Sequence, residues 1–249
     1  MILPRGINQL MASLEKEVRS LKRKKIIIAI DGHSSSGKST LSKDLARTLE
    51  MVHIDTGAMY RAVTLYFINK EIPIDDEARI ENALREVKIQ LLGPTQGNRT
   101  ILNDLDVSQE IRSIKVNNHV SEVAANSQVR RFLVEQQRAL AQQNSVIMDG
   151  RDIGTVVFPD ADVKLFVTAS IEERTQRRYL ELKEKGIQIS LDEVASNLSS
   201  RDEIDSTRED SPLRRAEDAY LLDTSFLDRN TMLSEALKYI ITQTSTTKE

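Results

Sequence analysis

Hydrophobic and polar positions follow two alternating periods along most of this chain. Short apolar runs typical of buried strands occur at residues 26–30, 52–54, 145–148, 163–167 and 221–224. Apolar residues at helical spacing lie between these runs and predict helices at 58–69, 77–86, 119–142, 171–185 and 232–241. The same spacing predicts one more helix shortly after the first strand and another that begins near residue 191. Strands that alternate with helices predict an α/β fold, in which a parallel sheet is covered by helices on both faces.

The alternation changes between residues 87 and 103. Val87, Ile89 and Leu91 alternate with polar residues, as in a half-exposed strand. A turn cluster at 93–98 then leads to a second strand at 100–103. Two strands joined by a turn predict a small antiparallel insertion in the alternating chain.

The two ends of the chain stand apart from this pattern. Apolar residues at helical spacing within residues 1–24 predict an amphipathic helical extension before the core. Three roles stay open for it: packing on the domain, self-association with a partner chain, and lying on a membrane surface. Residues 242–249 are expected to form a disordered tail.

Composition narrows the class of function. The 249 residues carry a net charge of −3, which argues against a protein that coats nucleic acid. Cysteine is absent, which excludes disulfides and thiolate chemistry, and three histidines leave little scope for a multi-histidine metal site. The longest apolar run, Ile26 to Ile30, is far shorter than the roughly 20 residues that cross a bilayer. We therefore expect a cytoplasmic protein with small-molecule partners and no membrane or nucleic-acid partner.

The strongest chemical signal follows the first strand, where the chain fits the pattern G-x-x-x-x-G-K-[ST]. Glycines at both ends let the loop curl so that backbone N–H groups face an anion, and the following helix N-terminus adds partial positive charge. Lys38 can reach terminal phosphates, and the Ser39 hydroxyl can hold Mg²⁺ directly. The predicted ATP site comprises Gly32, His33, Ser34, Ser35, Ser36, Gly37, Lys38, Ser39 and Thr40.

Polar groups also follow the other predicted strands. The segments Asp55-Thr56-Gly57 and Asp149-Gly150-Arg151-Asp152 stand at such strand ends. In parallel sheets, ligands gather at the carboxyl ends of strands, so these groups are expected to converge on one site. Asp149 ends a buried strand, and we expect it to meet Mg²⁺ through a water molecule.

Several arginines suit a phosphorylated ligand. Arg61 lies about one turn into a predicted helix and has the planar fork that binds phosphate, although a surface arginine paired with a carboxylate would look the same. Arg174, Arg177 and Arg178 share one helix face. That face is either an ion-paired, solvated surface or a set of catalytic arginines that close over a moving phosphoryl group. High polarity and the following Gly186 favour a lid at about 171–190.

Three segments carry a family resemblance: Asp55-Thr56-Gly57-Ala58-Met59-Tyr60-Arg61, Asp106-Val107-Ser108 to Arg112, and Asp149-Gly150-Arg151-Asp152-Ile153-Gly154-Thr155-Val156-Val157-Phe158-Pro159. With them the chain closely resembles bacterial cytidylate kinases, which are P-loop nucleoside monophosphate (NMP) kinases, over about residues 25 to 240. The resemblance implies transfer of the γ-phosphoryl group of ATP to CMP or dCMP, with Mg²⁺, in pyrimidine nucleotide metabolism. It implies a P-loop kinase core at 25–86 and 143–241 and an NMP-binding insertion with its helices at 87–142. We expect the protein to be a monomer.

The same resemblance gives roles to individual residues. Lys38, Arg174, Arg177 and Arg178 are the implied catalytic residues. Cytosine is implied to contact Ser121, Arg130 and Asp152, and the acceptor phosphate to contact Arg61, Arg151 and Arg208. Asp205, with Arg201 nearby, is implied to bind the sugar hydroxyls, and Thr56 completes the CMP site.

Chemistry supports the choice of base. Cytosine presents an amino donor at N4 beside acceptors at N3 and O2, so a carboxylate and an arginine complement it. Uracil would place an acceptor opposite Asp152, which costs roughly 1–3 kcal/mol. No general base is required, because a phosphate monoester is already mostly dianionic at neutral pH.

Two other functions stay open. One is an NMP kinase that acts on UMP or dTMP. The other is a nucleotide-binding module that regulates or scaffolds without turnover and docks through the N-terminal helix. Arg61, Arg151 and Arg208 discriminate against the module, because a switch that only binds ATP needs no second phosphate seat.

Overall fold

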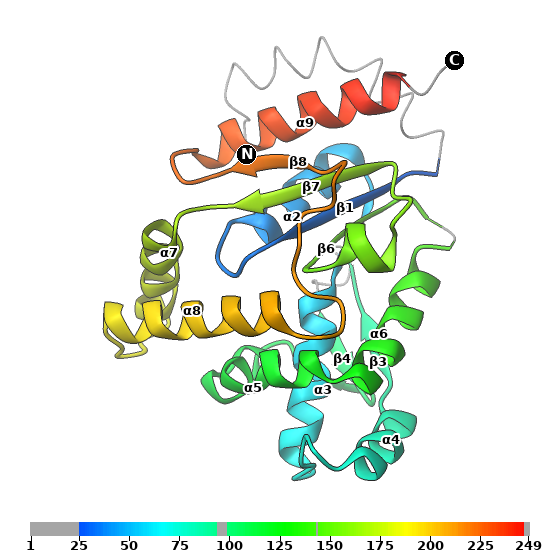
Figure 1. Cartoon of the computed structure of the whole chain (residues 1–249), viewed down its shortest axis with the longest axis vertical. Coiled ribbons are helices and arrows are strands. Elements are labelled where there is room, and N and C mark those ends of the chain that lie inside the picture. The colour runs from blue at the N-terminus through cyan, green and yellow to red at the C-terminus, as the bar shows by residue number, and fades with distance from the viewer. Residues whose placement is uncertain (1–24, 94–98, 143, 247–249) are drawn as a thin grey trace.

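The computed structural model describes residues 25–93, 99–142 and 144–246 (Figure 1). The extension predicted at 1–24 lies outside the described residues, as does most of the turn at 93–98. Five parallel strands form the main sheet in the order β2-β6-β1-β7-β8. They are β1 (Ile27–Gly32), β2 (Val52–Asp55), β6 (Val146–Gly150), β7 (Val163–Thr168) and β8 (Tyr220–Asp223). The predicted α/β fold is confirmed.

Helices cover both faces of this sheet, as alternate side chains of β1 show. Ile28 and Ile30 are fully buried in a cluster with residues of α2 (Lys38–Leu49) and α9 (Arg229–Thr246). Ala29 points the other way and packs in a cluster with Val134 of α6 (Ser127–Leu140). In Figure 1, α9 lies above the sheet and α6 below it. The sheet is therefore buried on both faces, and function has to lie at its edges.

The predicted antiparallel insertion is also confirmed. Strands β3 (Ile89–Leu91), β4 (Thr100–Leu102) and the short β5 (Leu105–Asp106) form a separate three-stranded sheet. It follows α3 (Thr56–Asn69) and α4 (Glu77–Glu86), and a turn of 3₁₀ helix (Glu110–Arg112) leads out of it. Apolar residues of the insertion pack in one cluster with those of α3 and α4.

The single helical stretch predicted at 119–142 is wrong. The structure has two helices, α5 (Ile114–Ala125) and α6, divided at Asn126. The Asn126 side chain accepts hydrogen bonds from the backbone N–H groups of Gln128 and Val129, which caps α6. Ser113 caps α5 in the same way through Val116 N–H. Two consecutive caps therefore replace the continuous helix.

The disordered tail predicted at 242–249 is wrong as far as residue 246. Helix α9 continues to Thr246, five residues beyond the predicted end at 241. The hydroxyl groups of Thr242 and Thr244 donate to the carbonyl oxygens of Lys238 and Ile240, one turn back. The helix therefore extends past its last buried residues, and residues 247–249 lie outside the described part.

Helices α7 (Ile171–Glu184) and α8 (Leu191–Thr207) form a pair beside the carboxyl ends of the strands (Figure 1). Leu182, Val194 and Leu198 form a small apolar cluster of their own between them. The pair contains the segment predicted to be a lid, whose movement stays a prediction. Within the described ranges, no helix is both long and apolar enough to span a membrane.

Candidate active site

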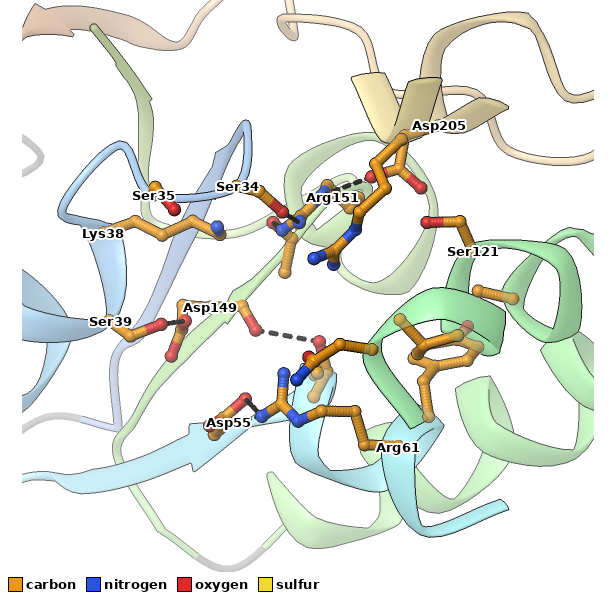
Figure 2. Close-up of a pocket in the computed structure, with 18 of the residues that line it drawn as sticks. Ser34, Ser35, Lys38, Ser39, Asp55, Arg61, Ser121, Asp149, Arg151 and Asp205 are labelled. Carbon is orange, nitrogen blue, oxygen red and sulfur yellow. Dashed lines mark hydrogen bonds and ion pairs between the residues drawn. The ribbon is translucent and has the colours of Figure 1, made fainter. Parts of the chain in front are cut away.

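A cavity of about 560 Å³ opens where the carboxyl ends of the central strands meet α3, α5, α7 and α8. Eleven Lys and Arg side chains but five Asp and Glu side chains line it. In Figure 2, Lys38 and Ser39 lie on one side and Ser121 and Asp205 on the other, with Arg61 and Arg151 between. This excess of positive charge suits a ligand with several negative charges.

The glycine-bounded loop forms one side of the cavity. Gly32 has φ 150°, and a Cβ there would lie 2.0 Å from the carbonyl oxygen of Val167 in β7. Gly37 has φ 89° and begins α2 without any side-chain cap, and the first turn of α2 holds no acidic residue. The first N–H groups of α2 are therefore available to an anion.

Lys38 points into this loop. Its Nζ donates to the carbonyl oxygen of His33 at 2.9 Å, and only 7% of the residue is exposed. Burial, followed by the nearby positive charge of Arg151, lowers the pKa of Lys38 to about 7. A bound phosphate would supply the missing counter-charge and raise that pKa again.

Three of the predicted ATP-site residues are not among those that line the cavity. These are Gly32, His33 and Ser36. The His33 ring packs edge-on against Phe166 with the ring centres 6.0 Å apart. The carbonyl oxygen of Ser36 accepts a hydrogen bond from Thr224. These residues shape the loop, whereas Ser34, Ser35, Gly37, Lys38, Ser39 and Thr40 face the cavity.

Ser39 and Asp149 lie side by side at the base of the cavity (Figure 2). The Ser39 hydroxyl donates to Asp149 Oδ2 at 2.6 Å. His53 Nε2 lies 2.6 Å from Asp149 Oδ1, and Thr56 Oγ1 donates to the Asp149 carbonyl oxygen at 2.8 Å. Among the described residues, no group of three or more His, Asp or Glu side chains could hold a metal by itself. One hydroxyl with one carboxylate suits Mg²⁺, which takes most of its ligands from water and phosphates.

The guanidinium groups in the middle of the cavity are incompletely paired. Arg151 donates to Asp205 Oδ2 and Ser34 Oγ, each at 2.8 Å, and so joins α8 to the loop. Arg61 pairs with Asp55 at 3.2 Å, but its Nε is buried without a partner. Nε of Arg201 and Nη2 of Arg208 are likewise buried without a hydrogen-bond partner. Buried donors of this kind are costly, so they point to an anion that binds among them.

Arg201 Nε is buried among other positively charged side chains. Burial, and then the positive charge of Arg151, lower its pKa to about 10. The charges of Arg61 and Arg178 act in the same direction. Arg201 was predicted to lie near a sugar, but its neighbours place it within the cluster of guanidinium groups.

The residues predicted to read the base gather at the far side of the cavity. Arg130 is 2% exposed, forms an ion pair with Asp152 and donates to the Ala124 carbonyl oxygen at 3.1 Å. Its guanidinium also lies 5.6 Å from the centre of the Tyr60 ring. Ser121 of α5 lines the same wall. The positive and negative partners for a polar base are therefore together and shielded from water.

A buried carboxylate fixes the segment that carries Asp152. Both oxygens of Asp31, at the end of β1, accept hydrogen bonds at 2.8 Å, from the N–H groups of Ile153 and Gly154. Burial raises the pKa of Asp31 to about 7 in spite of these two bonds. Asp31 therefore anchors the turn that follows Asp152.

The three arginines of α7 do not share one environment. Arg177 and Arg178 line the cavity, where Arg177 donates to Thr224 and Arg178 pairs with Glu181 at 2.7 Å. Arg174 does not line the cavity. It is 6% exposed and pairs with Asp202 of α8 at 2.6 Å. In this conformation Arg174 braces α7 against α8, whereas the prediction placed it over the phosphates.

Sequence reasoning missed several residues that line the cavity. Among them are Tyr60, Lys43, Arg112, Asn117 and Lys185. The Tyr60 hydroxyl is buried without a partner, and burial raises the pKa of this phenol. Tyr60 stands within the Asp55 to Arg61 motif, so the motif could have drawn attention to it. Arg112 likewise ends the Asp106 to Arg112 segment of the resemblance, although no role was given to it. Lys43, Asn117 and Lys185 had no signal apart from their charge or polarity.

The fold and the cavity define a P-loop protein whose glycine-bounded loop shares one cavity with a cluster of arginines. The family model described as cytidylate kinase matches residues 28–242. A cytidylate kinase of Phocaeicola vulgatus is 53% identical over 210 residues, covering 82% of this chain and 91% of that protein. A cytidylate kinase of Carboxydothermus hydrogenoformans is 45% identical over 213 residues, covering 86% of this chain and 96% of that protein. The chain belongs to the cytidylate kinase family.

Proposed function

We propose that this protein transfers the γ-phosphoryl group of ATP to CMP or dCMP and releases ADP with CDP or dCDP. One observation carries the proposal beyond family membership. The loop at the N-terminus of α2 shares one cavity with a cluster of buried arginines whose N–H groups lack partners. A triphosphate suits the loop, and a monophosphate suits the arginine cluster. A protein that only binds ATP would need the loop but not the arginine cluster.

The donor end of the site is the loop of residues 32–40. The free N–H groups at the start of α2 would bind the β- and γ-phosphates, and Lys38 would move from the His33 carbonyl oxygen to the γ-phosphate. Ser39 would ligate Mg²⁺ directly, and Asp149 would bind a water of its hydration shell. Bound Mg²⁺ neutralises charge on the phosphate oxygens.

The acceptor end is the cluster of guanidinium groups. Arg61, Arg151 and Arg208 would bind the phosphate of CMP. We add Arg201 to them because it lines the same cavity and its Nε is buried without a hydrogen-bond partner. Asp205 would accept a hydrogen bond from a sugar hydroxyl. Asp152 would accept from the N4 amino group of cytosine, and Arg130 and Ser121 would complete the recognition of its edge.

Catalysis in this arrangement is positioning and neutralisation of charge. The acceptor phosphate is already mostly dianionic at pH 7, so it can attack without a base. Lys38, Arg177 and Arg178 surround the place between the two phosphate seats, where negative charge spreads during transfer. Closure of α7 and α8 would exclude water and prevent loss of the phosphoryl group to hydrolysis. Arg174 would contact the phosphates only if that closure breaks its ion pair with Asp202.

An ADP-release assay across CMP, dCMP, UMP, AMP and dTMP tests the proposed reaction. We expect turnover with CMP, dCMP or both at a kcat/KM at least about tenfold above that for UMP, from the cost of an unmatched buried polar group. Turnover with UMP or dTMP but not CMP would overturn the choice of substrate. ATP binding without turnover of any acceptor would instead favour a regulatory module.

A monomer in solution stays a prediction. Self-association through residues 1–24 and a cytoplasmic location stay predictions as well.

A further inference from the structure

Asp149 is held at three of its oxygen atoms, and one of the partners was not expected. Ser39 and Thr56 bind its Oδ2 and its carbonyl oxygen, as the motifs suggest. The third partner is His53 of β2, whose Nε2 lies 2.6 Å from Oδ1. β2 and β6 run parallel with Asp55 opposite Asp149, so His53 reaches across the ladder to this carboxylate.

Two hydrogen-bond donors face the Asp149 carboxylate. Ser39 Oγ donates to Oδ2, and the His53 tautomer that carries its proton on Nε2 donates to Oδ1, because an ionised carboxylate only accepts hydrogen bonds. With its proton directed to Asp149, the Ser39 hydroxyl has its lone pairs free to face a cation. The direction of those lone pairs then depends on where the Asp149 carboxylate is fixed.

His53 has little opportunity to act on a nucleotide itself. Its side chain is 10% exposed, and it is not among the residues that line the cavity. The Asp149 side chain is 2% exposed, and Oδ1 has His53 as its hydrogen-bond partner. Any influence of His53 on the reaction would therefore pass through Asp149.

We propose that His53 is a positioning residue of the magnesium site. By fixing Asp149 Oδ1, it holds Oδ2 against Ser39 and so orients the hydroxyl that ligates the metal. This inference rests on the proposed roles of Ser39 and Asp149. Partners of this kind that orient metal-binding groups typically change metal affinity 10–100-fold when they are removed.

Binding of Mn²⁺ to the complex of the full-length enzyme with ADP, followed by electron paramagnetic resonance, tests the proposal. Mn²⁺ replaces Mg²⁺ because it prefers the same oxygen ligands and can be detected directly. We expect His53→Leu to raise the dissociation constant of Mn²⁺ about tenfold. His53→Gln should stay within about threefold of wild type, because its amide nitrogen can occupy the place of Nε2. His53→Asn has an amide that is too short to reach Asp149, so it should raise the dissociation constant of Mn²⁺ about tenfold as well. This polar variant gives the result if His53→Leu folds poorly.

Matched controls separate positioning from a merely structural role. Binding of ADP without metal, measured by calorimetry with a chelator present, should not change in any His53 variant. His119 is an exposed histidine paired with a carboxylate, Glu122, at 3.4 Å, so His119→Leu should leave Mn²⁺ binding unchanged. In the Asp149→Asn background, His53→Leu should add less than about a twofold effect, because coupled residues are not additive.

Each contrary result has a distinct meaning. Unchanged Mn²⁺ binding in His53→Leu and His53→Asn, beside a clear loss in Asp149→Asn, overturns the role of His53 alone. An equal loss from His53→Leu with and without Asp149 also overturns it, since the effect would not pass through the carboxylate. Unchanged binding in Asp149→Asn overturns the proposed metal site itself.

Discussion

Lys38→Ala is expected to lower kcat about 10³-fold while the protein stays folded. The Lys38 ammonium is the charge at the donor end that lies within the loop, and removal of one donor from such a preorganised site costs 10²–10³ in rate. Little stability should be lost. The pKa of Lys38 is depressed to about 7 in the folded, empty protein, so below pH 7 its buried charge destabilises the fold. Steady-state kinetics and thermal unfolding measure the two effects.

Proton uptake gives a second readout of the same variant. At pH 8 the Lys38 amine is mostly neutral in the free enzyme, and bound phosphates would raise its pKa and protonate it. ATP binding at pH 8 should therefore take up most of one proton, measured by calorimetry in buffers of different ionisation enthalpy, and Lys38→Ala should not. Lys238→Ala, on the exposed face of α9, is the control. Turnover of Lys38→Ala near the wild-type rate would contradict its assigned role.

Asp152→Asn is expected to lower the ratio of kcat/KM for CMP to that for UMP by about 10–100-fold. Asp152 is 3% exposed and lies in the wall predicted to face the base. An asparagine amide can donate to O4 of uracil, whereas the carboxylate opposes that oxygen at a cost of roughly 1–3 kcal/mol. The CMP and UMP rates, measured side by side, give the ratio.

The same change also weakens a buried ion pair. Arg130 would lose its buried charged partner and keep Asp210, whose Oδ1 lies 3.7 Å from Nε. Removal of one member of a buried pair typically destabilises a protein by about 3–5 kcal/mol. Kinetics should therefore be measured well below the unfolding temperature of the variant. Asp160→Asn, on the exposed loop before β7, controls for the loss of a charge. An unchanged CMP to UMP ratio in a folded Asp152→Asn protein would refute the role of Asp152.

The order of the main elements could be predicted from the sequence because it follows from local patterns. The strand, loop and helix around Lys38 are encoded within one continuous segment, and helix Glu77–Glu86 has the predicted ends. The break between α5 and α6 was missed because asparagine occurs both inside helices and as an N-cap. Only the hydrogen bonds that Asn126 accepts from the N–H groups of Gln128 and Val129 show that it is a cap here.

Contacts between segments far apart in the chain could not be predicted from the sequence. Helical spacing placed Arg174, Arg177 and Arg178 on one face, but it could not show that Asp202 of α8 binds the first of them. Alternation along β2 puts His53 and Asp55 on one face, yet the contact with Asp149 depends on the register of β6. The burial that leaves Arg201 Nε without a partner is a property of the packed cavity.

An inhibitor that joins cytidine and adenosine 5′ to 5′ through five phosphates tests most directly whether two nucleotide seats face one another. Both seats lie in one cavity, so one molecule can fill them, and the second contact becomes intramolecular. We expect competition with ATP and with CMP alike, and an inhibition constant at least about 100-fold below the dissociation constant of CMP. Competition with ATP alone, at an affinity no better than that of ATP, would contradict the facing seats.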